Sequence, residues 1–142
     1  MGRYEFLEEV ALADCAVEVK GDDLDDLFAT AATALAEVMV DPATVPSTVE
    51  RAITLTASQL DLLLYDWLSE LIYRKDRDRE IFTRADVRVR GTGPFELTAR
   101  LQGGVIDSEL TALRADAKAV TFHQFALERN GGGWRARIVI DI

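Results

Sequence analysis

The chain has 142 residues, of which 49% are hydrophobic and 29% are charged, values that are typical of a globular domain and too apolar for a disordered protein. Its 25 acidic and 16 basic residues give a formal net charge of −9, which repels phosphate backbones and argues against tight direct binding of nucleic acid. A single cysteine (Cys15) and a single histidine (His123) exclude an internal disulfide and a Cys/His zinc site, and no apolar segment approaches the roughly 18 residues of a membrane span, so we expect one cytoplasmic domain over residues 1–142.

The first half of the sequence predicts three strands and two amphipathic helices. Two-residue alternation predicts strands over 4–7 and 15–19. Aspartates at 22, 23, 25 and 26, followed by apolar residues at helical spacing, predict a helix that ends at Met39, before Pro42. A third strand is expected over 49–55. Ser58 with Asp61 resembles a capping box, so a second helix should begin there and end in the charged stretch 74–78.

The second half alternates with the two-residue period of strands. Residues 85–89 and 95–101 predict an antiparallel hairpin around the turn 91–94. A later strand should place four side chains on one face, namely Thr121, His123, Phe125 and Leu127. Turn residues 130–133 lead into a last strand whose buried face begins at Trp134 and continues to Ile142. The predicted fold class is α+β, with two amphipathic helices packed on a mostly antiparallel β-sheet.

Four stretches, distributed along almost the whole chain, carry a family resemblance. The first joins residues 4–8 to the Ala13-Asp14 step and the strand up to Gly21, and the second is the helix over 23–39 with its exit Val40-Asp41-Pro42. The third is Asp66-Trp67-Leu68-Ser69-Glu70-Leu71-Ile72-Tyr73, and the fourth comprises 118–123 with the closing strand 134–142. In this order and spacing they resemble the archease family. Ala11 and Leu12 depart from the family pattern, since a His-Thr pair commonly stands there.

The resemblance implies a metal site. In the family a metal is held by the aspartate of the first strand pair and by the last two residues, which correspond here to Asp14, Asp141 and Ile142, the last through its main-chain oxygens. From the pattern alone these aspartates would be solvated strand positions, and the resemblance reverses that preference. Oxygen ligands suit a hard divalent cation, so we expect calcium first, with magnesium left open. Lys118 and His123 match the family motif, and their part in the site stays open.

The resemblance also implies a function. Archease-like proteins are non-catalytic activators of the GTP-dependent tRNA-splicing RNA ligase, promoting its guanylylation and multiple turnover, and the acidic surface of this chain suits a basic RNA-binding partner. One alternative is a modulator or chaperone of a tRNA-modifying methyltransferase. Another is a metal-dependent hydrolase that uses Asp14 and Asp141 as ligands and His123 as base. Cys15, Trp67 and Trp134 are interpreted as core residues.

Overall fold

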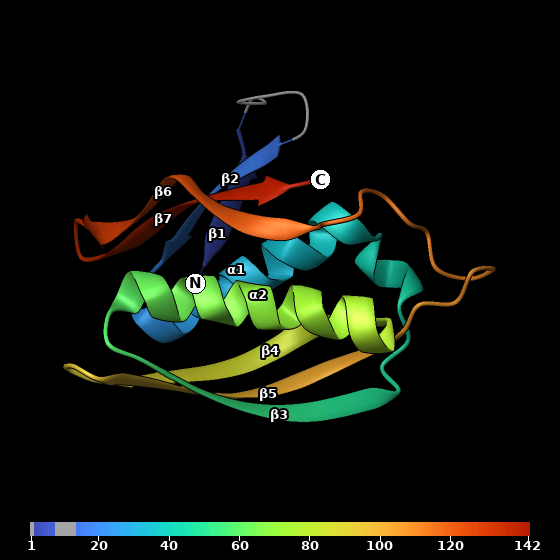
Figure 1. The fold of residues 1–142 in the computed structure, drawn as a ribbon, viewed down its shortest axis with the longest axis horizontal. Coiled ribbons are helices and arrows are strands. Elements are labelled where there is room, and N and C mark those ends of the chain that lie inside the picture. The colour runs from blue at the N-terminus through green and yellow to red at the C-terminus, as the bar shows by residue number, and fades with distance from the viewer. Residues whose placement is uncertain (1, 8–13) are drawn as a thin grey trace.

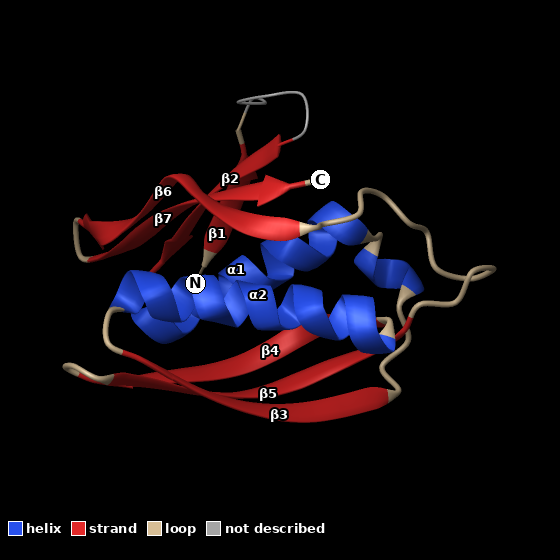
Figure 2. Cartoon of the chain, viewed as in Figure 1, coloured by secondary structure: helices blue, strands red, loops and turns tan. Residues whose placement is uncertain are grey.

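The protein folds into two antiparallel sheets with two helices between them, as Figures 1 and 2 show. The computed structural model describes residues 2–7 and 14–142, without the side chains of His123 and Gln124. The elements are β1 (Arg3–Phe6), β2 (Asp14–Gly21), α1 (Leu24–Met39), the short 3-10 helix η1 (Pro42–Thr44), β3 (Val49–Ala57), α2 (Leu60–Asp78), β4 (Glu80–Gly91), β5 (Phe95–Val105), β6 (Ala119–Asn130) and β7 (Gly133–Asp141). The sheets have strand orders β1-β2-β7-β6 and β3-β5-β4. The predicted class and the two helices are confirmed, and the division of the strands into two sheets is new.

Local chemistry explains where α1 begins and where α2 ends. Asp23 caps α1 by accepting a hydrogen bond of 2.8 Å from the backbone N–H of Asp26. The capping box predicted at Ser58 is wrong, because Gln59 is the N-cap of α2 and its side chain forms no cap hydrogen bond. Helix α2 ends at Asp78, and its C-cap Arg79 adopts a left-handed conformation. Neither of these helices has an apolar stretch long enough to cross a membrane, nor does any other helix in the described residues.

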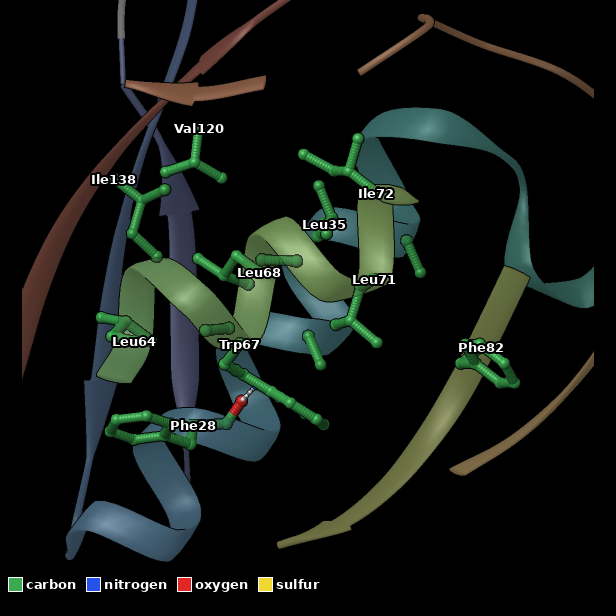
Figure 3. Packing of buried hydrophobic residues seen from close by; sticks show 14 of the residues in the cluster. Phe28, Leu35, Leu64, Trp67, Leu68, Leu71, Ile72, Phe82, Val120 and Ile138 are labelled. Carbon is green, nitrogen blue, oxygen red and sulfur yellow. Dashed lines mark hydrogen bonds between the residues drawn. The ribbon is translucent and has the colours of Figure 1, made fainter. Parts of the chain in front are cut away.

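The core lies in the helical layer. Trp67 of α2 is completely buried, and its indole N–H donates a 3.0 Å hydrogen bond to the carbonyl oxygen of Phe28 in α1. Figure 3 shows Ile138 of the four-stranded sheet and Phe82 of the three-stranded sheet packing on this layer from its two sides. Apolar surface buried on both sides of the helices stabilises the two sheets together, because both pack on the same helical layer.

Strand β6 departs from the simple alternation that we predicted. Thr121 pairs with Val139, but the next paired residue, Ala126, pairs with Arg137. A bulge therefore separates the two, and the prediction of a single face running from Thr121 to Leu127 is wrong, because extra residues in one strand of a ladder change the face on which later side chains lie. The ring of Phe122, at the start of the bulge, stacks on Tyr65 of α2 with 4.3 Å between centroids.

Candidate metal site

The two predicted aspartates lie side by side in the four-stranded sheet. Asp14 begins β2 and Asp141 ends β7, and the register of these antiparallel strands makes them direct cross-strand partners. Their side chains lie on the face away from the helices, because the neighbouring pair Cys15 and Ile140 packs toward the core. Side chains on directly opposite residues have Cβ atoms about 4.5–5.5 Å apart. The structure thus brings together two carboxylates that are far apart in the sequence.

The two carboxylates have no ion-pair partner among the described residues. Like charges directly opposite each other destabilise a sheet, and no described side chain forms an ion pair with Asp14 or Asp141. Elsewhere in the same sheet Glu5 faces Glu18, but there Lys20 lies 3.6 Å from the Glu18 carboxylate. An uncompensated anionic pair at one end of a sheet is the arrangement that a divalent cation would neutralise.

The surface next to the carboxylates is buried, although it lies on the outer side of the sheet. Ala16 and Val139, the next outward pair along the two strands, have no exposed surface. Thr121 pairs with Val139 in turn, and its hydroxyl oxygen is buried with no hydrogen-bond partner in the described part of the chain. Sequence analysis missed Thr121, because its place beside the carboxylates depends on the register of β6 against β7.

Other predicted site residues have different outcomes. The backbone N–H of Lys118 donates a 2.8 Å hydrogen bond to the carbonyl oxygen of Asp141, so the main chain of Lys118 touches the site. The side chain of His123 and the departure at Ala11 and Leu12 lie outside the described residues. Ile142 follows Asp141 directly and packs partly buried against the core.

The donors available at this place suit a hard cation. No group of three or more His, Cys, Asp and Glu residues that could hold a metal occurs in the described ranges 2–7 and 14–142. A cation between β2 and β7 would therefore depend on the carboxylates of Asp14 and Asp141, with a main-chain oxygen of Ile142 as a further donor. All of these are oxygen ligands, which calcium and magnesium prefer, and water would complete the coordination.

The interpretation of Cys15, Trp67 and Trp134 as core residues is confirmed. Cys15 packs against the core and pairs with Ile140, as predicted for a small core residue. Trp67 is buried, and Trp134 is partly buried against the core with the guanidinium of Arg129 4.9 Å from its ring centre. None of these three side chains needs a ligand to explain its position.

Comparison with known proteins identifies relatives along the full chain. The model of the Archease protein family matches residues 4–142. Proteins named archease from Methanosarcina mazei and Methanothermobacter thermautotrophicus are 34% and 33% identical, covering 99% and 100% of this chain and 96% and 100% of their own. A solution structure from Methanobacterium thermoautotrophicum superimposes with a TM-score of 0.80 at 32% identity, covering 98% of both chains. The crystal structure of an archease from Thermotoga maritima, described as a possible chaperone, shares the fold with a TM-score of 0.64 at 18% identity, covering 97% of this chain and 98% of that one.

Proposed function

Because this chain belongs to the archease family, we propose that it is a non-catalytic activator of the GTP-dependent tRNA-splicing RNA ligase. It would promote guanylylation and multiple turnover of the ligase through a metal site at Asp14, Asp141 and the main chain of Ile142. The observation that carries this proposal is the direct pairing of Asp14 with Asp141 across β2 and β7, with no ion-pair partner for either carboxylate among the described residues. Membership of the family supports a protein partner, and the register of β2 against β7 supports the choice of Asp14 and Asp141 as ligands.

The role of each residue follows from its position. Asp14 and Asp141 are fixed by paired backbone strands, so two carboxylates are held together at little cost in conformational entropy. A bound divalent cation would neutralise their repulsion and offer its remaining coordination positions to oxygen ligands. The hydrogen bond from Lys118 holds the main chain of Asp141 in place. The net charge of −9 favours approach to a basic RNA-binding protein.

The decisive test is multiple-turnover RNA ligation by the cognate ligase with GTP, with and without this protein. We expect Asp14→Asn and Asp141→Asn each to weaken calcium affinity and stimulation at least roughly tenfold, because each removes an anionic ligand while nearly preserving shape. Asp86→Asn is the matched control, since Asp86 is an exposed aspartate on the other sheet. If both site variants bind calcium and stimulate ligation like the control, the proposed site is wrong.

The part of Ile142 can be tested separately. A Gly-Ser extension after Ile142 leaves every side chain in place but converts its carboxylate into an amide and alters the donors at this position. We expect weaker calcium binding and weaker stimulation from the extended protein than from a protein with the same extension before Met1. Equal stimulation by the two extended forms would remove Ile142 from the ligand set and leave the two aspartates.

Two other functions remain as proposals with their own tests. A modulator or chaperone of a tRNA-modifying methyltransferase belongs to the same class of interaction proteins, and the description of the Thermotoga maritima structure as a possible chaperone favours keeping it. Affinity measurements with the ligase and with the methyltransferase as alternative partners would separate them. Turnover of phosphate esters by the isolated protein would instead favour a metal-dependent hydrolase.

A further inference from the structure

The long β5–β6 loop, residues 106–118, is bound to both helices by hydrogen bonds although it contains little regular structure. It connects the two sheets and runs antiparallel to the end of α1. Backbone hydrogen bonds hold it there: Arg114 N to Met39 O (2.8 Å), Ala115 N to Val38 O (3.0 Å) and Asp41 N to Ala112 O (2.9 Å). Long ordered loops of this kind usually carry function in compact domains.

A buried lysine clamps the second half of the loop to α2. Lys75 is only 8% exposed, and its ammonium group donates to a carboxylate oxygen of Asp116 (2.5 Å) and to the carbonyl oxygen of Ala117 (2.8 Å), and lies 2.6 Å from a carboxylate oxygen of Asp76. Burial alone would lower the pKa of Lys75, but the hydrogen bonds and charges of Asp116 and Asp76 outweigh it and raise that pKa. Lys75 therefore stays protonated and acts as a tether.

The loop nevertheless leaves its two leucines in solvent. Leu110 is 71% exposed and Leu113 is 60% exposed, which makes them the two most exposed large apolar side chains in the described residues. An ordered loop gains nothing within the chain by presenting leucines to water. Rigid, exposed apolar side chains are what a protein interface uses at its centre, where they are buried without a further loss of loop entropy.

Leu113 also forms one wall of a pocket of about 320 Å³. Its apolar walls come from the end of α1, the start of β4 and the loop: Met39, Val40, Ile81, Ile106 and Leu113. This volume lies at the small end of the range of ligand pockets, roughly 300–1,000 Å³. The pocket therefore suits one or two side chains of a docked segment.

The charges around the pocket select a carboxylate. Asp76 and Asp116 in its wall are already paired with Lys75, and Arg114 is 2.6 Å from the Glu37 carboxylate. Arg79 also lines the pocket, is exposed, and its guanidinium has no partner among the described residues. Its backbone is fixed as the C-cap of α2. The guanidinium of Arg79 is therefore a cation beside an apolar pocket, and it is available to bind a carboxylate.

We propose that this pocket is a docking site for a segment of a protein partner that inserts an apolar side chain and presents a neighbouring carboxylate to Arg79. The docking site is joined to the metal site, because Asp116 is clamped to Lys75 and Lys118, two residues later, bonds to Asp141. Three residues of extended chain span about 10 Å. One partner can therefore contact both places. The proposal rests on the proposed function in expecting a protein partner, for which we take the RNA ligase.

The first experiment measures affinity for the cognate ligase by calorimetry. We expect Leu113→Ser to weaken binding at least tenfold and Arg79→Gln at least threefold. The matched controls are Leu62→Ser, an exposed leucine on α2, and Arg88→Gln, an exposed arginine on β4. Both controls should bind within twofold of the wild-type protein. Because all four side chains are exposed, we expect every variant to fold, which circular dichroism checks.

The second experiment needs no ligase. In an NMR titration, N-acetyl-leucine should shift the methyl resonances of Ile106 and Leu113 more than N-acetyl-leucinamide, which lacks the carboxylate. Arg79→Gln should remove this difference between the two compounds. Equal shifts with both compounds in the wild-type protein would overturn the carboxylate-selective pocket.

The two experiments distinguish failure of this inference from failure of the proposed function. If Leu113→Ser and Arg79→Gln both bind the ligase like the wild-type protein while Asp14→Asn loses stimulation, the docking site is wrong and the proposed function stands. If the wild-type protein does not bind the ligase, the proposed function fails. In that case an Arg79-dependent shift with N-acetyl-leucine still supports the pocket, and its absence overturns the pocket as well.

Discussion

The two sheets pack against the same pair of helices, yet they use their outer faces differently. In the three-stranded sheet each strand has exposed outward residues, for example Thr54, Arg88 and Thr98. In the four-stranded sheet the outward pair Ala16 and Val139 has no exposed surface. One sheet is therefore buried on a single face, as antiparallel sheets commonly are, while the other also has buried positions on its outer face.

The two sheets also differ in the charges that face each other across neighbouring strands. Across β4 and β5, Asp86 faces Arg100 and Arg90 faces Glu96, so opposite charges meet. Across β2 and β7, Asp14 faces Asp141. Both sheets contain a register shift, but the four-stranded sheet also contains paired like charges and a buried hydroxyl, that of Thr121, with no hydrogen-bond partner among the described residues. Such departures from local consistency are expected where a protein carries function.

The largest effect should come from the layer that both sheets share. Trp67→Ala removes the buried indole and leaves the carbonyl of Phe28 without its donor, and we expect a loss of about 3–5 kcal/mol in the free energy of unfolding. Urea denaturation followed by far-UV circular dichroism and by Trp134 fluorescence should give coincident transitions. Separate transitions would show that the sheets unfold independently and that the helical layer does not join them into one cooperative unit.

A matched pair of substitutions tests the difference between the outer faces. Val139→Ala removes two methyl groups from a fully buried position, so we expect it to lower stability by about 2 kcal/mol. Thr98→Ala changes an exposed position on the central strand of the other sheet and should lower it by less than about 1 kcal/mol. Chemical denaturation of both variants decides the matter. Equal losses would mean that the outer faces are alike.

The contribution of Lys75 to stability should decline at alkaline pH. Lys75→Met removes the tether from α2 to Asp116, and we expect a loss of roughly 1–2 kcal/mol at neutral pH, since the partner carboxylates are exposed and can rehydrate. The pKa of Lys75 is raised above its ordinary value of 10.5, so its contribution is complete below that pH and declines as the pH rises through the raised value. Above pH 10.5 the stability of the wild-type protein should therefore approach that of the variant. A difference between them that stays constant to the highest usable pH would contradict this role.

The smallest expected change in stability concerns the carboxylate pair of Asp14 and Asp141. In the presence of a chelator, Asp14→Asn or Asp141→Asn should leave stability unchanged or raise it by up to about 1 kcal/mol, because each relieves repulsion between opposite like charges. Added calcium should stabilise the wild-type protein and not the variants, since a ligand stabilises the state that binds it. Thermal denaturation with and without calcium measures both. An equal calcium response in all three proteins would place the cation elsewhere.

Much of the architecture could be predicted from local patterns. The bounds of α1 followed from the aspartates at its start and the apolar spacing up to Met39, since both signals act within a few residues of each other. The hairpin of β4 and β5 followed from two-residue alternation around a glycine-rich turn. The family resemblance pointed to Asp14 and Asp141, which pattern alone would have left as solvated positions.

Only the tertiary structure decided where these residues meet. The sequence separates Asp14 from Asp141 by nearly its whole length, and their direct pairing exists because β2 lies beside β7 in one particular register. The bulge that displaces Phe122 and the clamp from Lys75 to Asp116 likewise depend on contacts between distant elements. Periodicity and capping report on neighbours along the chain, whereas strand order, register and the pockets between elements come from packing the whole molecule, which no local pattern encodes.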